Sequence, residues 1–170
     1  MTKLEINSAE EMQKLGASLA KTAKPHDLLL LNGDLGAGKT TLTQGLGRTL
    51  GVHRPVKSPT FTIVREYREA KLSLFHMDFY RLENDDLSSI DLDGYLAEPG
   101  LVVIEWPQLV MNDLPDEYLQ LTITRVDDSW DSTKRVVELN AHGKRNEEWV
   151  KDALTEYEKD LGLFMSMSLS

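Results

Sequence analysis

Nine consecutive residues constrain the fold of this chain more than any other stretch. Residues 33–41 read GDLGAGKTT and match the pattern G-x-x-x-x-G-K-S/T at every fixed position. The apolar run 28–31 comes directly before them, and a helix-compatible segment from Lys39 to Leu50 follows and stops at Gly51. Strand, glycine loop and helix in this order predict a phosphate-binding loop. The alternative, a chance match in a glycine-containing turn, is expected on the order of 0.5% of the time in a chain of this length.

The chemistry expected of this loop follows from its residue types. Glycine adopts positive φ, so the backbone can curl around an anion with its N–H groups pointing inward. The helix that follows adds unpaired N–H groups and the positive end of its dipole. Lys39 is expected to reach the β- and γ-phosphates of a nucleotide, and the Thr40 hydroxyl to hold a Mg²⁺ ion. The pattern leaves open which nucleotide is bound and what is done with it.

Length and composition narrow the remaining classes. The 170 residues, 41% of them hydrophobic, suit one domain, which we expect at residues 1–163, with a flexible tail at 164–170. Lys and Arg number 19 against 28 Asp and Glu, and a net charge of −9 is a poor basis for gripping nucleic acid directly. The absence of cysteine excludes thiol catalysis, disulfides and zinc–thiolate sites. Since no apolar run approaches the ~20 residues of a membrane helix, we expect a cytoplasmic protein with no membrane partner.

An acidic residue ends the most apolar of the later segments. Residues 101–104 form a near-continuous apolar run, typical of a strand buried on both faces, and Glu105 follows it. Pro107 cannot continue a central strand, so the acid is held at the strand end. This is the Walker-B arrangement, in which the carboxylate binds Mg²⁺ directly or through water. A surface acid at a strand terminus is the alternative.

A second group of polar side chains is expected at another strand end. The segment 76–82 reads HMDFYRL, and ligands of open α/β sheets bind at the carboxyl ends of strands. The density of ionisable groups favours a site role for Asp78. For His76 and Arg81 a site role and a structural role are equally compatible with the pattern. Thr60, within SPT, belongs either to an ordinary turn or to a switch loop that senses the γ-phosphate or the metal.

Further elements are expected around these segments. The expected hairpins pair 63–68 with 72–78 and 118–126 with 135–139. The expected helices are one capped by Ser8 and stopped before Pro25, one within 83–96 with Asn84 as cap and Gly94 as a break, and an amphipathic one opening at Asn146. Gly45 and Gly47, inside the helix after the loop, cost about 1 kcal/mol each relative to alanine, and close packing is the only reason we can offer for them.

Four segments, taken together, point to a known family. They are GDLGAGKTT at 33–41, SPTFT at 58–62, HMDFYRL at 76–82 and IEWP at 104–107. In this order and spacing, from about Ser8 to Gly143, the chain resembles the bacterial TsaE family, also called YjeE, of small P-loop ATPases. The resemblance implies an α/β, P-loop NTPase-like three-layer fold, in which a partly parallel central sheet is flanked by antiparallel strands.

The resemblance also implies a pathway and partners. It implies that ATP hydrolysis serves the threonylcarbamoyladenosine modification of tRNA. In that pathway the TsaC enzyme makes a threonylcarbamoyl-adenylate, and a TsaB–TsaD complex transfers the group to tRNA. TsaE binds that complex and is needed for repeated turnover. The net negative charge of this chain agrees with a role in which the complex, and not this chain, makes most of the contact with tRNA.

Carried onto this chain, the resemblance implies a role for each candidate residue. The implied phosphate cradle is made by Gly36, Ala37, Gly38, Lys39, Thr40 and Thr41. Thr40 and Glu105 are the implied Mg²⁺ ligands, Asp78 the second acid, and Thr60 the switch residue. Ser8 and Arg135 are implied to touch the nucleotide from either end of the domain. The helix beyond Gly143 lies outside the family resemblance.

The expected reaction is in-line attack of water on the γ-phosphate of ATP. Lys39 and the loop N–H groups stabilise the spreading charge, and Asp78 or Glu105 orients the water. Together with Thr60, these are the expected catalytic residues. Two other functions use the same loop. A P-loop small-molecule kinase needs an acceptor pocket and an arginine-rich lid, but residues 83–99 contain no arginine. A GTP-dependent binding switch needs an N-K-x-D segment, which the chain lacks.

Overall fold

The computed structural model describes residues 1–56, 63–80, 84–127, 129 and 131–169. Within these residues the centre of the fold is a seven-stranded sheet in the order β1-β7-β6-β2-β5-β4-β3. The strands are β1 (Thr2–Ile6), β2 (Leu28–Asn32), β3 (Val64–Tyr67), β4 (Ser73–Asp78), β5 (Gly100–Glu105), β6 (Tyr118–Arg125) and β7 (Arg135–His142). The α-helices are α1 (Ala9–Thr22), α2 (Lys39–Thr49), α3 (Leu92–Ala97) and α4 (Lys144–Leu169). Short 3-10 helices are η1 (Asn84–Ser89), η2 (Pro107–Leu109) and η3 (Met111–Asp113).

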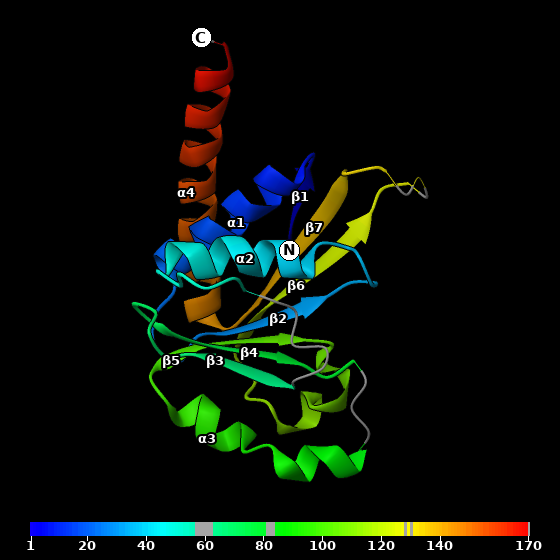
Figure 1. Ribbon diagram of the computed structural model, residues 1–170, viewed down its shortest axis with the longest axis vertical. Helices are drawn as coiled ribbons and strands as arrows, with labels where there is room; N and C mark the ends of the chain where they lie inside the picture. Colours follow the sequence, from blue (N-terminus) through cyan, green and yellow to red (C-terminus); the bar gives the residue numbers. More distant parts are fainter. Residues whose placement is uncertain (57–62, 81–83, 128, 130, 170) are drawn as a thin grey trace.

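Strand directions divide the sheet into a parallel centre and antiparallel flanks. β2 runs parallel to both β5 and β6, and β4 runs parallel to β5. β7 and β1 extend one side, and β3 the other, by antiparallel pairing. Both expected hairpins are confirmed, as β3–β4 and β6–β7. The expected fold class is confirmed as well: α1, α2 and α4 cover one face of the sheet, and α3 with η1 lies on the other (Figure 1).

The apolar runs become the inner strands because both of their faces are covered. All six residues of β5 are buried, and so are the four leucines of β2. Alternate side chains of these strands pack into two separate hydrophobic cores, one on each face of the sheet. The larger core joins Leu29 and Leu31 to the helices α1, α2 and α4, while the smaller one joins Leu28 and Leu30 to the opposite face. The apolar run that precedes the glycine loop is therefore anchored from both sides.

α1 and α2 cross at glycines, where their backbones meet. The Ser8 hydroxyl accepts from the Glu11 amide and caps α1, as expected. A Cβ on Gly45 would lie 2.6 Å from the Cα of Gln13 and closer still to its carbonyl oxygen. A Cβ on Gly16 would lie 2.9 Å from the amide nitrogen of Leu46 and closer to the carbonyl of the preceding turn. Close packing thus accounts for Gly45.

Two sequence expectations about helices need correction. Gly94 does not break a helix but lies inside α3, where its amide donates to Asp91 Oδ1 at 3.0 Å. Asp91 therefore caps α3, and the stretch that was expected to be capped by Asn84 is divided into η1 and α3. The last helix begins at Lys144, two residues before the expected Asn146, and its backbone continues through Leu169. The division into a domain at 1–163 and a tail at 164–170 stays a prediction.

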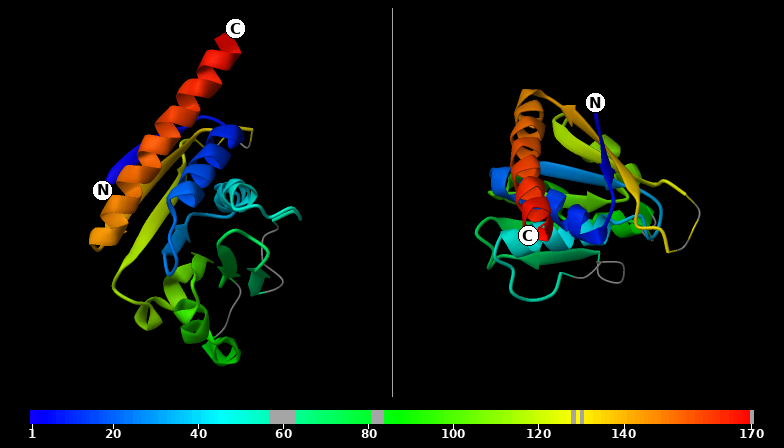
Figure 2. Two further views of the ribbon diagram at one scale, coloured as in Figure 1. Left: turned by 90° about the vertical axis from the view of Figure 1, so that its left-hand side faces the viewer. Right: turned by 90° about the horizontal axis from the view of Figure 1, so that it is seen from above.

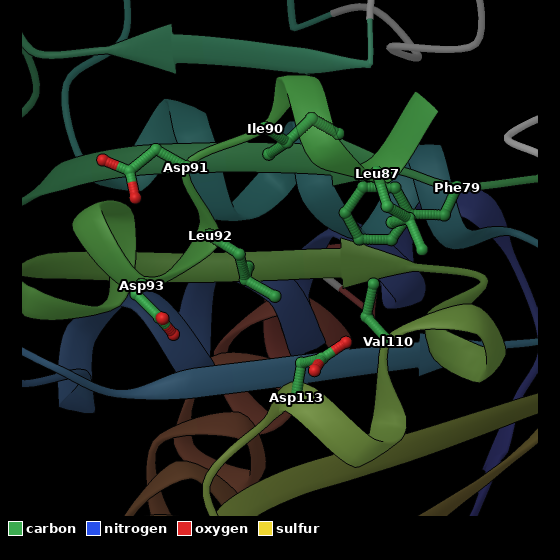
Figure 3. A pocket seen from close by; sticks show the side chains of 8 residues that line it. All are labelled: Phe79, Leu87, Ile90, Asp91, Leu92, Asp93, Val110 and Asp113. Carbon is green, nitrogen blue, oxygen red and sulfur yellow. The ribbon is translucent and has the colours of Figure 1, made fainter. Parts of the chain in front are cut away.

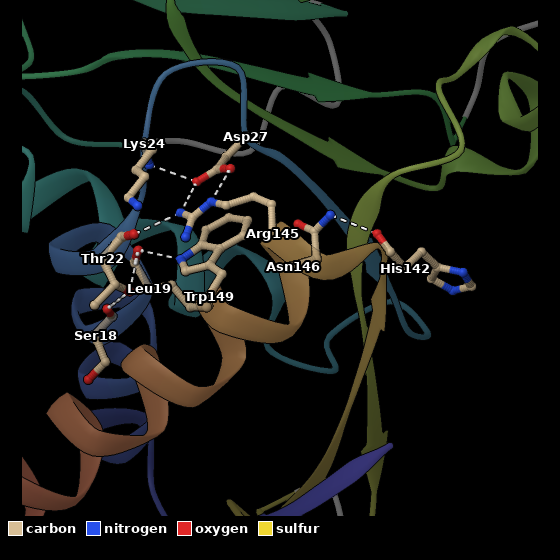
Figure 4. Close-up of polar contacts among 9 residues, drawn as sticks. All are labelled: Ser18, Leu19, Thr22, Lys24, Asp27, His142, Arg145, Asn146 and Trp149. Carbon is tan, nitrogen blue, oxygen red and sulfur yellow. Dashed lines mark hydrogen bonds and ion pairs between the residues drawn. The ribbon is translucent and has the colours of Figure 1, made fainter.

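A polar clamp fastens α4 to the end of α1 (Figure 4). The Arg145 guanidinium donates to both carboxylate oxygens of the buried Asp27, at 3.1 and 2.6 Å, and to the Thr22 carbonyl at 3.0 Å. One turn along α4, the buried Trp149 indole donates to the Leu19 carbonyl at 3.1 Å. α4 lies along α1, and its last turns extend past the rest of the protein (Figure 2). None of the helices in the described ranges has the length and apolar character to traverse a lipid bilayer.

Candidate functional site

Sheet topology brings the predicted acids to the phosphate loop. Asp78 and Glu105 are the last residues of β4 and β5, and the register of these parallel strands sets them side by side. Glu105 is also paired with Leu31 of β2, which leads directly into the loop. Since all three strands end at one edge of the sheet, residues far apart in sequence converge there. Both acids are buried, with 7% of Asp78 and 2% of Glu105 exposed.

The loop has the backbone conformation that its glycines permit. Gly36 has φ of 76° and Gly38 has φ of 123°, a region that other residues rarely adopt. Gly38 is also the N-cap of α2 and has no side chain with which to cap the helix, so the first amides of α2 receive no side-chain cap from it. The Ala37 amide is used inside the loop, where it donates to the Asp34 carbonyl at 3.0 Å.

Lys39 lies folded against the loop that carries it. Its ammonium donates to the Gly33 carbonyl and, at 3.5 Å, to the Asp34 carbonyl. The Nζ atom lies 4.0 Å from the centre of the Trp106 ring, within the range of a cation–π contact. Burial lowers the pKa of the Lys39 ammonium from its ordinary value, although nearby carboxylates, Glu105 first among them, oppose that shift.

The two acids have different partners. Glu105 Oε2 lies 2.5 Å from Nε2 of His76, whose side chain is fully buried. Asp78 Oδ1 accepts from the amide of Tyr80 at 2.9 Å, which holds the carboxylate toward the chain that leaves β4. Neighbouring main-chain bonds fix this end of the sheet, since the Phe79 amide donates to the Glu105 carbonyl at 3.1 Å. His76, which the sequence left between a site role and a structural one, is placed in the site.

Two aromatic residues belong to the site without having been predicted. Trp106 has φ of 54°, one of two non-glycine residues with positive φ in the described part of the chain. This conformation turns the chain after Glu105, and the indole ring lies between Lys39 and the ring of Tyr80, whose centre is 4.7 Å away. The only sequence signal was adjacency, since Trp106 follows the predicted acid and Tyr80 follows Asp78 by two residues.

Ser8 and Arg135 come together at the other end of the loop. Both line a pocket of about 100 Å³ whose remaining wall includes Gly36, Gly38 and Thr41. Arg135 Nε donates to the Ala37 carbonyl at 2.8 Å, and its other nitrogens donate to main-chain carbonyls at 2.9 to 3.4 Å. Burial is the main cause that lowers the pKa of Arg135. Arg135 thus supports the loop from β7, and a contact with a nucleotide stays a prediction for both residues.

Two further predictions lie outside the described residues. Thr60, the expected switch residue, falls in 57–62, and Arg81 falls in 81–83. Their roles stay predictions.

The oxygen donors suit a magnesium ion bound together with a phosphate ligand. Within the described ranges no group of three or more His, Asp or Glu side chains could hold a metal ion alone. Magnesium typically binds to one or two carboxylates and to substrate phosphates, keeping several waters. Glu105, buried at the strand end, and Thr40, in the first turn of α2, offer one carboxylate and one hydroxyl next to the loop. The chemistry of these two residues therefore fits the ion.

A larger pocket, of about 370 Å³, lies on the opposite face of the sheet (Figure 3). The side chains of Phe79, Leu87 and Val110 gather at one end of it, and Asp91 and Asp93 lie at the other. Phe79 and Val110 belong to the smaller core, whereas the loop helix packs on the larger one. This pocket therefore does not open toward Lys39.

Comparisons with known proteins agree with the geometry. The family model for threonylcarbamoyl adenosine biosynthesis protein TsaE matches residues 6–136. The tRNA threonylcarbamoyladenosine biosynthesis protein TsaE of Bacillus subtilis is 44% identical over 138 residues, covering 81% of this chain and 84% of that protein. The protein of that name from a Nostoc species is 42% identical over 132 residues, covering 75% of this chain and 81% of the relative. The crystal structure of Bacillus subtilis YdiB superposes with a TM-score of 0.78 at 36% identity, covering 91% of this chain and 94% of that one. The chain belongs to the TsaE family of tRNA threonylcarbamoyladenosine biosynthesis proteins.

Proposed function

We propose that this protein is a cytoplasmic, magnesium-dependent ATPase that acts on a TsaB–TsaD-type complex in tRNA threonylcarbamoyladenosine biosynthesis. One observation carries the proposal: Asp78 and Glu105 end neighbouring parallel strands, beside Lys39 and a glycine loop with positive φ at Gly36 and Gly38. The family membership supports the pathway. The net charge of −9 supports contact with tRNA through the complex instead of directly.

In the proposed reaction the side chains and amides of the site bind the phosphates, orient the attacking water and stabilise the charge that develops. Lys39 exchanges the Gly33 and Asp34 carbonyls for oxygens of the β- and γ-phosphates, and the free amides of α2 donate to the same group. Thr40 and Glu105 would hold Mg²⁺, and the ion would supply positive charge next to the phosphates. Asp78 or Glu105 orients the attacking water.

The reaction is proposed to be slow without the partner. Arg135 donates its guanidinium to the loop carbonyls and is therefore committed to holding the loop. We therefore assign the arginine that stabilises the charge of the transition state to Arg81 or to the complex. An arginine of this kind raises the rate by about 10³–10⁵-fold. Docking of the complex is therefore expected to raise turnover well above the basal rate.

The test is ATP hydrolysis with and without the TsaB–TsaD complex, for the native protein and three variants. Lys39→Ala, Asp78→Ala and Glu105→Ala are each expected to lower stimulated turnover by about 10²-fold or more. Asp113→Ala removes an exposed acid on the opposite face and is the matched control, expected to retain native turnover. A titration that compares ATP with GTP identifies the base. Native activity in all three site variants, or no stimulation by the complex, would refute the proposal.

The alternative of a small-molecule kinase receives less support. A kinase needs a pocket that holds an acceptor hydroxyl against the γ-phosphate. The 370 Å³ pocket lies on the other face of the sheet, and its charged lining residues are acidic: Asp91, Asp93 and Asp113. Labelled phosphate recovered on a metabolite instead of as free phosphate would reverse this preference.

A further inference from the structure

His76 and Glu105 form a buried pair across two neighbouring strands. In the β4–β5 register His76 is paired with Val103, and Glu105 is paired with Asp78. Glu105 is therefore the diagonal neighbour of His76 on the same face of the sheet. The imidazole has 0% of its side chain exposed and the carboxylate 3%, and Nε2 lies 2.5 Å from Oε2. The contact is thus short and shielded from water.

The surroundings of the ring indicate which nitrogen carries a proton. Nδ1 of His76 is buried and has no hydrogen-bond partner among the residues that the structure describes. A proton on Nδ1 would leave a buried donor unpaired, and the carboxylate would then face a lone pair on Nε2. The tautomer with the proton on Nε2 avoids both problems, because Nε2–H donates to Oε2 and a bare lone pair remains at Nδ1.

The pair also keeps Glu105 apart from the other charge of the site. In the described structure the ammonium of Lys39 donates to main-chain carbonyls, and the carboxylate of Glu105 accepts from His76. A direct ion pair between Lys39 and Glu105 would consume the phosphate-binding cation and the metal-binding acid together. A carboxylate with one oxygen bonded to a buried ring is less free to form that ion pair.

We propose that His76 is the positioning residue of Glu105: it holds Oε2, so that the carboxylate keeps the orientation in which it binds magnesium. This inference rests on the proposed function, in which Glu105 is a metal ligand. Residues that hold a metal ligand in place are typically worth about 10- to 100-fold in metal affinity. His76 itself touches neither the nucleotide nor the metal.

The experiment compares three substitutions on β4. His76→Leu removes the donor at similar size, His76→Gln can keep an N–H near the position of Nε2, and Met77→Leu changes a buried side chain that points to the opposite core. For each protein, ATP binding is measured by calorimetry over a range of Mg²⁺ concentrations and again in EDTA. His76→Leu is expected to raise the half-saturating Mg²⁺ concentration about 10- to 100-fold, with ATP binding in EDTA within about twofold of native. His76→Gln is expected to recover most of the loss, and Met77→Leu to bind like the native protein.

A second measurement needs no ligand and covers the case in which His76→Leu does not fold. The ¹⁵N spectrum of the imidazoles in the native protein, assigned by comparison with His76→Gln, is expected to show His76 protonated on Nε2 and unprotonated on Nδ1. A ring whose only proton is on Nδ1 would overturn the inference, and so would equal Mg²⁺ requirements in His76→Leu and the native protein.

A Glu105→Gln variant separates this inference from the proposed function. If Glu105→Gln raises the half-saturating Mg²⁺ concentration and His76→Leu does not, the positioning role is wrong and the metal site stands. If Glu105→Gln leaves the Mg²⁺ dependence unchanged, the proposed metal site is itself wrong.

Discussion

Replacing Gly45 with alanine puts a methyl group into the crossing of α1 and α2. The added Cβ would lie 2.6 Å from Cα and 2.7 Å from the carbonyl carbon of Gln13, and closer still to its oxygen. Cβ atoms essentially never approach other atoms within 3.0 Å. Because every clashing atom is backbone, no side-chain rotation relieves the contact, and the helices must separate by roughly 1 Å.

The size of the effect follows from two opposing terms. Overpacking of this kind costs about 1–3 kcal/mol, and a clash with rigid backbone belongs at the upper end of that range. Alanine in place of glycine inside a helix returns about 1 kcal/mol. The net loss for Gly45→Ala is then about 2 kcal/mol. In a protein of this size that loss lowers the melting temperature by about 4–8 °C.

Thermal unfolding followed by circular dichroism measures this, with Gly162→Ala as the matched control. Gly162 also lies inside a helix, but it is exposed and a Cβ there would meet nothing within 4 Å. The same substitution is therefore expected to leave the melting temperature unchanged or to raise it slightly. A Gly45→Ala protein that melts as high as the native one would refute the reasoning, because the two helices could not then be in backbone contact.

Three further outcomes are expected. The Tyr157 hydroxyl is buried and has no hydrogen-bond partner in the described part of the chain, and burial raises its pKa to about 12. The contribution of Tyr157 to stability is therefore full below the unfolded pKa of about 10 and is lost as pH rises through about 12. In urea unfolding at pH 7, Tyr157→Phe should therefore be more stable than the native protein by about 1 kcal/mol. Between pH 7 and pH 11 the variant should lose less stability than the native protein, and equal losses would contradict this. Because burial depresses the pKa of Lys39, the unfolded chain binds more protons between that pKa and 10.5, and stability rises with pH there. A phosphate ligand restores the charge, so calorimetry at alkaline pH below 10.5, in buffers of different ionisation enthalpy, should detect proton uptake on ATP binding that is absent in Lys39→Arg. Arg145→Met removes the cation that pairs with the buried carboxylate of Asp27 and should lower the free energy of unfolding in urea by about 3–5 kcal/mol. Adding Asp27→Asn should recover part of this loss. Strictly additive effects of the two substitutions would speak against the clamp.

Sequence patterns were most informative where local chemistry decides the structure. The loop at 33–41 and the strand before Glu105 have patterns with few competing interpretations, and the structure has the expected elements at both. The convergence of Asp78 with Glu105 was also accessible, since the carboxyl ends of parallel strands share an edge.

What the sequence could not supply depends on long-range packing. The contact of His76 with Glu105 joins residues 29 positions apart in the chain and depends on the register of two strands. The position of Trp106 depends on a left-handed backbone that no pattern marks. Gly94 was misplaced because a glycine in a short polar segment resembles a break, whereas the cap that actually orders α3 is Asp91.

The way Lys39 is held has a consequence for selectivity. Its ammonium already has acceptors, the carbonyl oxygens of Gly33 and Asp34, so an incoming anion competes with them. An orthophosphate ion offers only a single anionic group and gains little from the exchange. A polyphosphate chain brings further oxygens that the helix amides can meet at the same time. We therefore expect the loop to favour a polyphosphate over the abundant small anions of a cell before any base is recognised.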